Sequence, residues 1–177
     1  MVLLNQDDWK SFVARTNDYN QRSLNAVMLD DIDISDCQDM VGTVNRYNGT
    51  FDGYGHTLTV NYSGNQQFIA PFSEVYNATI RDLTIAGTIT SSKKFTGGLV
   101  GTIHSGGDVT IERCVVMADM KFQVEGDASS GGVIGWMDAS SVNITNTSFI
   151  GTIQGDKCNN NGGFVGVAGP NCGITMT

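Results

Sequence analysis

The sequence predicts an all-β fold, a parallel β-helix with about 30–34 residues in each coil and a short helix before the first coil. One observation is a motif of two glycines, two apolar residues and a third glycine. It occurs three times, with starts 34 and 31 residues apart: 97–101, 131–135 and 162–166. A longer pattern begins at four isoleucines spaced 31, 33 and 30 residues apart: Ile80, Ile111, Ile144 and Ile174. A repeat of this length indicates stacked units that share one core.

Alternating residues identify the repeated segments as strands. After each isoleucine, apolar or small residues alternate with mostly polar ones, a period of two that is typical of β-strands. The segments are rich in Val, Ile, Thr and Gly and lack the helical spacing of apolar residues. We expect five inward columns, written in chain order: Ile80/Ile111/Ile144, Leu83/Cys114/Thr147, Ile85/Val116/Phe149, Gly87/Ala118/Gly151 and Ile89/Met120/Ile153. The small residues of the fourth column predict a crowded or bent backbone.

Charged residues outside these columns support the same register. The alignment places Arg81 beside Glu112 and Asp82 beside Arg113, so both steps pair opposite charges. Exposed ion pairs contribute only about 0–1 kcal/mol each. Their agreement with the alignment nevertheless favours coils stacked ~4.8 Å apart.

The pattern describes a single domain, residues 1–177. Residues 1–50 are expected to form the N-terminal cap and the first coil, and residues 51–177 the repeat coils. Residues 69–75 occupy the slot of residues 98–103 as a degenerate copy of the glycine motif.

An N-terminal helix is predicted over residues 6–16. Trp9, Phe12 and Val13 fall on one helical face, and Asn5 can cap the first turn. Such a helix would cover the apolar columns and unpaired strand groups at the open end of the first coil.

The C-terminus has no predicted cap, because the chain stops at Thr177 within the strand that begins at Ile174. We expect a fragment of a longer protein, without its signal peptide, whose remaining coils continue the stack.

The formal net charge of −8 and the sequence pI of about 4.4 argue against nucleic acid and anionic membrane as partners. No membrane insertion is expected.

Few residues offer catalytic chemistry. His56 and His104 lie beside glycines, and we interpret both as turn residues. Asp52 and Asp82 would form a carboxylate pair only if folding brought them together; a turn aspartate and a ladder aspartate are the favoured interpretation. We expect no enzyme, no catalytic residues and no cofactor.

Metal ligands are also sparse. The densest acidic run contains five residues: Asp30, Asp31, Asp33, Asp36 and Asp39. Calcium needs several converging oxygens, and the known calcium-loop spacings are missing, so a solvated negative edge is favoured and no metal site is expected.

The four cysteines lack zinc-site spacing. Cys114 falls in an inward column, and Cys172 aligns with Val109 and Val142, so we read both as small buried hydrophobes. Cys37 and Cys158 fall in predicted turns. Free thiols are favoured, with a disulfide involving Cys158 as the alternative.

Two features are candidate binding sites. Val115, Met117 and Ile150 form an outward apolar stripe, which either marks a partner surface or lies under a loop. Trp136, in the strand after the second glycine motif, either packs or presents an aromatic ring to a sugar.

The glycine motifs and the strands before them resemble the GLUG-motif repeats of bacterial exported and surface proteins. Residues 8–9, 31–35 and 51–57 look like the N-terminal segment of such repeats. The resemblance covers nearly the whole chain and implies a right-handed β-helix within a large adhesin-like protein, outside the cell or at its surface. The family motif is structural and implies no catalytic residues.

These observations predict a non-enzymatic structural or adhesive module whose outer faces bind a host protein or a glycan. The alternative is a carbohydrate-binding or carbohydrate-active β-helix, a class that resembles lyases and hydrolases.

Overall fold

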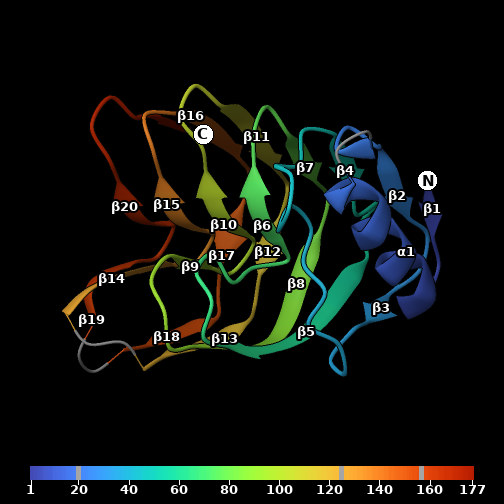
Figure 1. The fold of residues 1–177 in the computed structure, drawn as a ribbon, viewed down its shortest axis with the longest axis horizontal. Coiled ribbons are helices and arrows are strands. Elements are labelled where there is room, and N and C mark those ends of the chain that lie inside the picture. The colour runs from blue at the N-terminus through green and yellow to red at the C-terminus, as the bar shows by residue number, and fades with distance from the viewer. Residues whose placement is uncertain (19–20, 124–125, 156–157) are drawn as a thin grey trace.

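Parallel strands stack into a β-solenoid of about four turns, which confirms the predicted parallel β-helix. The structure is a computed structural model that describes residues 1–177 except 19–20, 124–125 and 156–157; the side chains of residues 126–128 and 158 are also outside the description. The coils follow one another along the long axis, with α1 at one end and β19 and β20 at the other (Figure 1). Strands account for 49% of the residues and helix for 8%.

Four parallel sheets form the walls of the solenoid. Sheet A contains β1 (Val2–Leu3), β2 (Ala26–Met28), β4 (Thr50–Asp52), β7 (Thr79–Arg81), β11 (Asp108–Glu112), β16 (Ser141–Thr145) and β21 (Gly173–Met176). Sheet B contains β3 (Ile32–Asp33), β5 (Thr57–Gly64), β8 (Thr84–Ser91), β12 (Val115–Val116), β13 (Asp119–Phe122), β17 (Ser148–Phe149) and β18 (Thr152–Gln154). Sheet C contains β6 (Phe72–Val75), β10 (Val100–Ile103), β15 (Ile134–Met137) and β20 (Val165–Ala168). Sheet D contains β9 (Thr96–Gly97), β14 (Gly126–Gly131) and β19 (Cys158–Gly162). From β7 onward the chain therefore visits sheets A, B, D and C in turn.

The register of the first three repeats is as predicted. In sheet A, Ile111 pairs with Ile80 on one side and Ile144 on the other. The same offsets hold in sheet B, where Val116 pairs with Ile85 and Phe149. The degenerate glycine slot is also confirmed, because Phe72–Val75 pairs with Val100–Ile103.

The predicted position of Ile174 in the column of Ile144 is wrong. Ile174 pairs with Val142, and Met176 is the residue that pairs with Ile144. Cys172 therefore does not align with Val142 either. A shift of two residues keeps the same side chains inward, so alternation alone could not distinguish the two registers.

Two polar residues follow the isoleucine of sheet A in each of these coils, and the second of them lies in the corner between sheets A and B. Asp82, Arg113 and Asn146 occupy equivalent positions there with left-handed φ angles of 51°, 51° and 48°. Of the two predicted pairs of opposite charges, one forms an ion pair: the guanidinium nitrogens Nε and Nη2 of Arg113 donate to the Asp82 carboxylate, at 2.6 and 2.7 Å. Arg81 instead binds Asp52 of the preceding coil at 2.9 Å.

Glycines occur where neighbouring coils approach too closely for a side chain. At Gly132, in the second glycine motif, an added Cβ would lie 2.1 Å from the carbonyl oxygen of Gly163 in the next coil. At Gly87, in the small column, an added Cβ would lie 2.0 Å from the carbonyl oxygen of Val60, and φ is +103°. The predicted crowding of that column is therefore confirmed.

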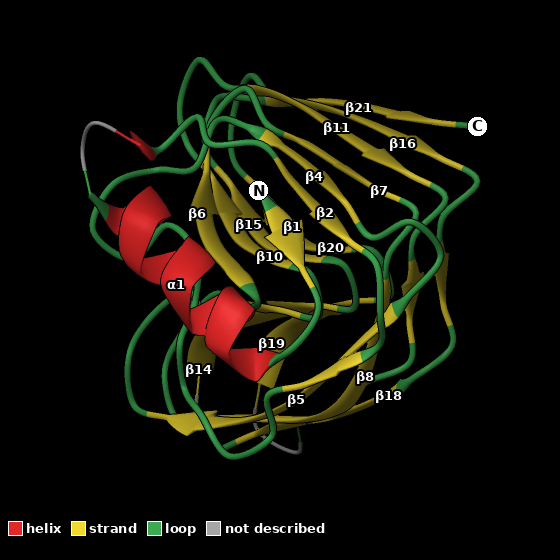
Figure 2. Ribbon diagram, turned by 90° about the vertical axis from the view of Figure 1, so that its right-hand side faces the viewer, coloured by secondary structure: helices red, strands yellow, loops and turns green. Residues whose placement is uncertain are grey.

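Helix α1 (Gln6–Asn17) lies across the N-terminal end of the solenoid, as predicted (Figure 2). The Asn5 side chain accepts a hydrogen bond from the backbone N–H of Asp8 at 3.0 Å. Trp9 and Phe12 are fully buried and meet an aromatic cluster from the first two coils that includes Phe51 and Phe72. Strand β1, which precedes the helix, was not predicted, because two residues are too few to show alternation.

Candidate functional site

The predicted apolar stripe lies on the outer face of sheet B. The backbone N–H of Met117 donates to the carbonyl of Ile85, and that of Ile150 donates to the carbonyl of Val116, so the two side chains occupy the same column in successive coils. Met117 is 47% exposed and Ile150 is 65% exposed, while Val115 is half-buried. Met117 and Ile150 therefore face solvent on this face.

Trp136 lies in a different place, on the outer face of sheet C. It pairs with Thr102 and Val167 of the two neighbouring coils. Its indole packs against two phenylalanines from earlier coils and is half-buried, so it is both packed and accessible. Trp136 is thus packed, as one interpretation predicted, and its contact with a sugar stays a prediction.

The three rings form what we call the aromatic group: Phe68, Phe95 and Trp136. The ring centroids of Phe95 and Trp136 are 4.8 Å apart, those of Phe68 and Phe95 are 5.6 Å apart, and those of Phe68 and Trp136 are 6.2 Å apart. The planes of all three rings lie within 22° of one another. Offset, nearly parallel rings at these distances attract one another beyond the effect of burial alone.

Unusual backbone geometry places the two phenylalanines. Phe68 and Phe95 have φ angles of 61° and 65°, in the left-handed region. Phe68 lies one residue before the degenerate copy of the glycine motif, and Phe95 lies two residues before the first motif, directly before β9 of sheet D. A bulky residue in this region carries a cost of about 1–2 kcal/mol, which must be offset by other interactions. Ring packing is one such interaction.

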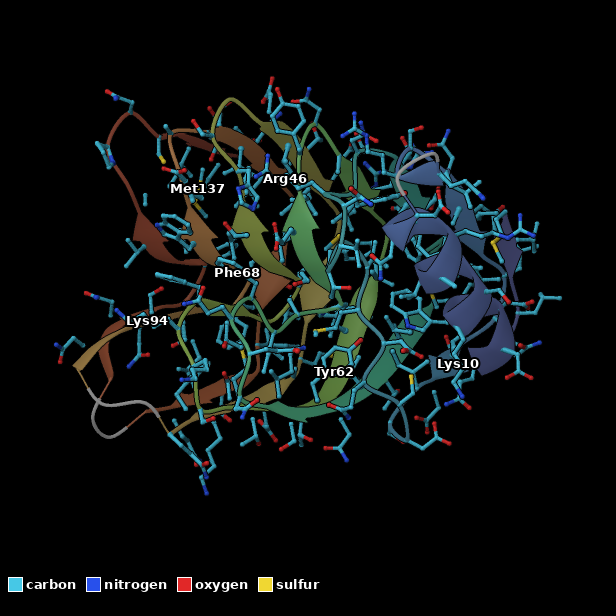
Figure 3. The ribbon with its side chains drawn as sticks, in the orientation of Figure 1. Lys10, Arg46, Tyr62, Phe68, Lys94 and Met137 are labelled. Carbon is cyan, nitrogen blue, oxygen red and sulfur yellow. The ribbon has the colours of Figure 1, made fainter. Side chains whose placement is uncertain are left out.

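A charged cluster borders the aromatic group, and we call it the ionic group: Arg46, Glu74 and His104. The distance from His104 Nε2 to Glu74 Oε2 is 2.6 Å, and the distance from Arg46 Nε to the same oxygen is 3.9 Å. The His104 ring meets the Phe68 ring edge-on at 6.4 Å between centroids, so the two groups are in contact. Figure 3 shows Phe68 and Arg46 on the side of the molecule where β6, β10 and β15 lie.

Glu74, Thr102 and Trp136 form one outward column across sheet C. Thr102 is fully buried although it lies on the outer face, and its Oγ1 has no hydrogen-bond partner among the described residues. Surrounding groups therefore cover the outer face of sheet C at Thr102, while the three aromatic rings remain partly exposed.

Several polar residues singled out in the sequence have roles in the fold, among them His104, which also belongs to the ionic group. His104 begins a turn, as predicted, because its carbonyl accepts from the N–H of Gly107. His56 also lies in a turn, and its Nδ1 is 3.3 Å from Asp31. Asp52 and Asp82 bind different arginines, as a turn and a ladder aspartate would.

Within the acidic run, individual carboxylates bind nearby backbone groups. Asp31 accepts from the backbone N–H of Thr57 at 2.8 Å, and this hydrogen bond lowers the pKa of the Asp31 carboxyl. Asp33 accepts from Ser35, which likewise lowers the pKa of its carboxyl. In the described part of the chain, no group of three or more His, Cys, Asp or Glu side chains is placed to hold a metal ion.

Cysteines at three positions are free thiols: Cys37, Cys114 and Cys172. Cys114 is buried in its predicted column, and burial raises the pKa of its thiol to about 12. Cys172 is only half-buried, so its prediction as a buried hydrophobe holds in part. The Cys158 side chain, on which the alternative disulfide depended, lies outside the described residues.

Comparison of the chain with protein-family models, with curated proteins and with solved structures gave no match in any of the three. None of the helices described is long and apolar enough to span a membrane.

The site on sheet C combines flat apolar rings, a carboxylate and two cationic or hydrogen-bonding side chains on a rigid wall. Such a combination can bind a ligand that has both an apolar face and hydroxyl groups. Sequence reasoning identified only Trp136. The alignment of residues 69–75 with 98–103 could also have identified Glu74, because it places Glu74 in the column of Trp136.

Proposed function

We propose that this chain is a non-enzymatic binding module, adhesive or structural, of an exported bacterial surface protein. Sheets of the solenoid form rigid walls, and binding takes place on their outer faces. The module acts outside the cell or at its surface, and further coils of a longer parent protein are among its partners. Host proteins and glycans are the ligand classes that we expect.

A single observation carries the proposal: the aromatic group lies beside the ionic group on the outer face of sheet C. Most outward positions of a solenoid are polar and dispensable for the core. Here three aromatic rings from successive coils gather outside the core, and two of them belong to residues with left-handed φ angles. Strained residues that are held in place by their surroundings are typical of binding sites.

Two further observations support the class of protein. The glycine motifs, on which the resemblance to GLUG repeats rests, occur where coils meet closely, which suits a structural repeat unit. At the C-terminal end, Ile174 and Met176 are 42% and 49% exposed on the last strand of sheet A, where a further coil could cover them. The exposed stripe of Met117 and Ile150 offers a second outer surface.

Saturable binding of the labelled chain to epithelial cells, to extracellular-matrix proteins or to a glycan array tests the proposal. We expect binding to at least one of them and no release of reducing sugar from polysaccharides. Trp136→Ala should weaken the binding, whereas Tyr54→Ala, which removes a 67% exposed aromatic ring at another corner, should not. Polysaccharide cleavage, or absence of saturable binding to all three, would refute the proposal.

A further inference from the structure

The aromatic group behaves as one surface. Phe68 and Trp136 belong to coils two steps apart, because Glu74 pairs with Thr102 and Thr102 pairs with Trp136. Two steps along the stack separate backbones by about 9.5 Å. The ring centroids are only 6.2 Å apart, so the rings lean toward each other across the intervening coil. Thr102, in that coil, is accordingly fully buried.

We propose that the aromatic group and the ionic group together bind an uncharged oligosaccharide. The inference rests on the proposed binding function and names the ligand class of that same site. The face of an aromatic ring is electronegative, and it attracts the C–H groups on the apolar face of a sugar ring. The three rings stack on one another and each remains partly exposed, so a pyranose would pack against the parts of their faces that the stack leaves accessible.

Polar groups at the border supply the second half of sugar recognition. Glu74, His104 and Arg46 have side chains that are 25%, 18% and 51% exposed, so a ligand can reach them. Both side chains lie beside Oε2 of Glu74, His104 Nε2 at 2.6 Å and Arg46 Nε at 3.9 Å, and limit the movement of that carboxylate. We assign Oε1 of the same carboxylate as the acceptor for a sugar hydroxyl, and Arg46, the most exposed of the three, as a donor.

The size of the site favours a small ligand over a folded protein. A stable protein interface buries about 800 Å² on each partner. All three rings are already half-buried by one another and by sheet C, so the remaining accessible surface is limited. Such a surface matches one or a few sugar rings.

Charge selects among small ligands. The chain carries a formal net charge of −8, while the one carboxylate of the site, Glu74, is balanced by Arg46. Nucleic acids and acidic glycans would be repelled at long range. An uncharged oligosaccharide meets no such repulsion.

Intrinsic fluorescence gives a direct assay, since the chain has two tryptophans and the other one, Trp9, is fully buried on the inner face of α1. Neutral and acidic oligosaccharides are first compared on a glycan array, and neutral binders are then titrated against the whole chain. We expect a saturable change in Trp136 fluorescence with neutral oligosaccharides. Trp136→Ala and Glu74→Gln should each weaken binding on the array about tenfold or more, with Tyr54→Ala as the unaffected control.

The variants also separate loss of binding from loss of folding. Glu74→Gln keeps the shape of the side chain, and Trp136→Phe keeps a ring, so Trp136→Phe should retain more affinity than Trp136→Ala. Binding to cells or matrix proteins without binding to any glycan would overturn the inference and leave the proposed function standing. Binding to acidic glycans alone, or equal loss in Tyr54→Ala and Trp136→Ala, would also overturn it. Absence of binding to cells, matrix proteins and glycans alike would refute both proposals.

Discussion

The glycine motif provides a matched pair of substitutions, because Gly132 and Gly163 occupy the same slot in successive coils. At Gly132, an alanine Cβ would lie 2.1 Å from the carbonyl oxygen of Gly163 and 2.5 Å from the ring of Phe149. At Gly163, no heavy atom of the described residues lies within 4 Å of the equivalent Cβ. The same change therefore tests coil-to-coil crowding with and without a neighbour.

The structure predicts effects of opposite sign. Gly132→Ala requires the neighbouring backbone to move by about 1 Å, and overpacking of this kind costs about 1–3 kcal/mol or more. A carbonyl oxygen cannot rotate away as a side chain can, so we expect a value of about 3 kcal/mol. Gly163→Ala meets no obstacle and reduces the entropy of the unfolded chain, which stabilises by about 0.4–1 kcal/mol.

Thermal unfolding followed by far-UV circular dichroism measures both effects. For a chain of this size, 1 kcal/mol shifts Tm by about 2–4 °C, so Gly132→Ala should lower Tm by about 6–12 °C. Gly163→Ala should leave Tm unchanged or raise it by a few degrees, by about the same conversion. Equal destabilisation by both variants would show that the motif needs glycine for its own turn conformation, and the argument from crowding would be wrong.

Three further predictions test the register, the exposed stripe and the ion-pair ladder. Ile111→Asp places a charge in a fully buried column and should lower the free energy of unfolding, measured in urea, by several kcal/mol. The outward Thr84→Asp should lower it by less than about 1 kcal/mol. Equal losses would show that the inward and outward faces are wrongly assigned. Replacing Met117 and Ile150 together by serine should change Tm little, because the two residues are 47% and 65% exposed, respectively. Unfolding of this double variant would show that the stripe belongs to the core. Hydrogen bonds from Arg113 lower the pKa of Asp82 below 3.8, so the ion pair stabilises the fold above that pH, and its contribution is lost as the pH falls through the lowered pKa. The wild-type chain should therefore lose more stability than Asp82→Asn between neutral pH and about pH 2. Parallel stability profiles of the two proteins against pH would contradict this prediction.

The repeat made most of the fold predictable from sequence. Columns such as Ile80, Ile111 and Ile144 recur at each coil, so the alignment of the copies directly gave the pairing of strands. The prediction failed at Ile174, where a slip of two residues keeps the alternation intact and only contacts can decide the register. Strand β1 was missed because two residues carry no period.

The candidate site was less predictable for a different physical reason. Its side chains come from four segments of the chain, and only Trp136 is conspicuous by residue type. Phe68 and Phe95 read as ordinary apolar residues, and their outward direction depends on left-handed φ angles that the sequence does not reveal for phenylalanine. Glu74 and His104 meet at 2.6 Å because coil stacking brings residues thirty positions apart into contact.

Departures from the repeat coincide with the proposed binding surface. Where the repeat is regular, small residues and alternation satisfy the packing of each coil, and left-handed corners carry polar residues such as Asp82 and Asn146, with the exposed Tyr54 as an aromatic exception. On sheet C two bulky phenylalanines adopt that same strained region, and a buried threonine hydroxyl beneath the outer face has no partner among the described residues. A sequence that only had to build coils would gain stability by relieving both. These strained and unpaired groups surround the aromatic group, which among the described residues is the one outward cluster of rings that also contacts charged side chains. For this physical reason we expect a ligand on sheet C rather than on the exposed stripe of sheet B.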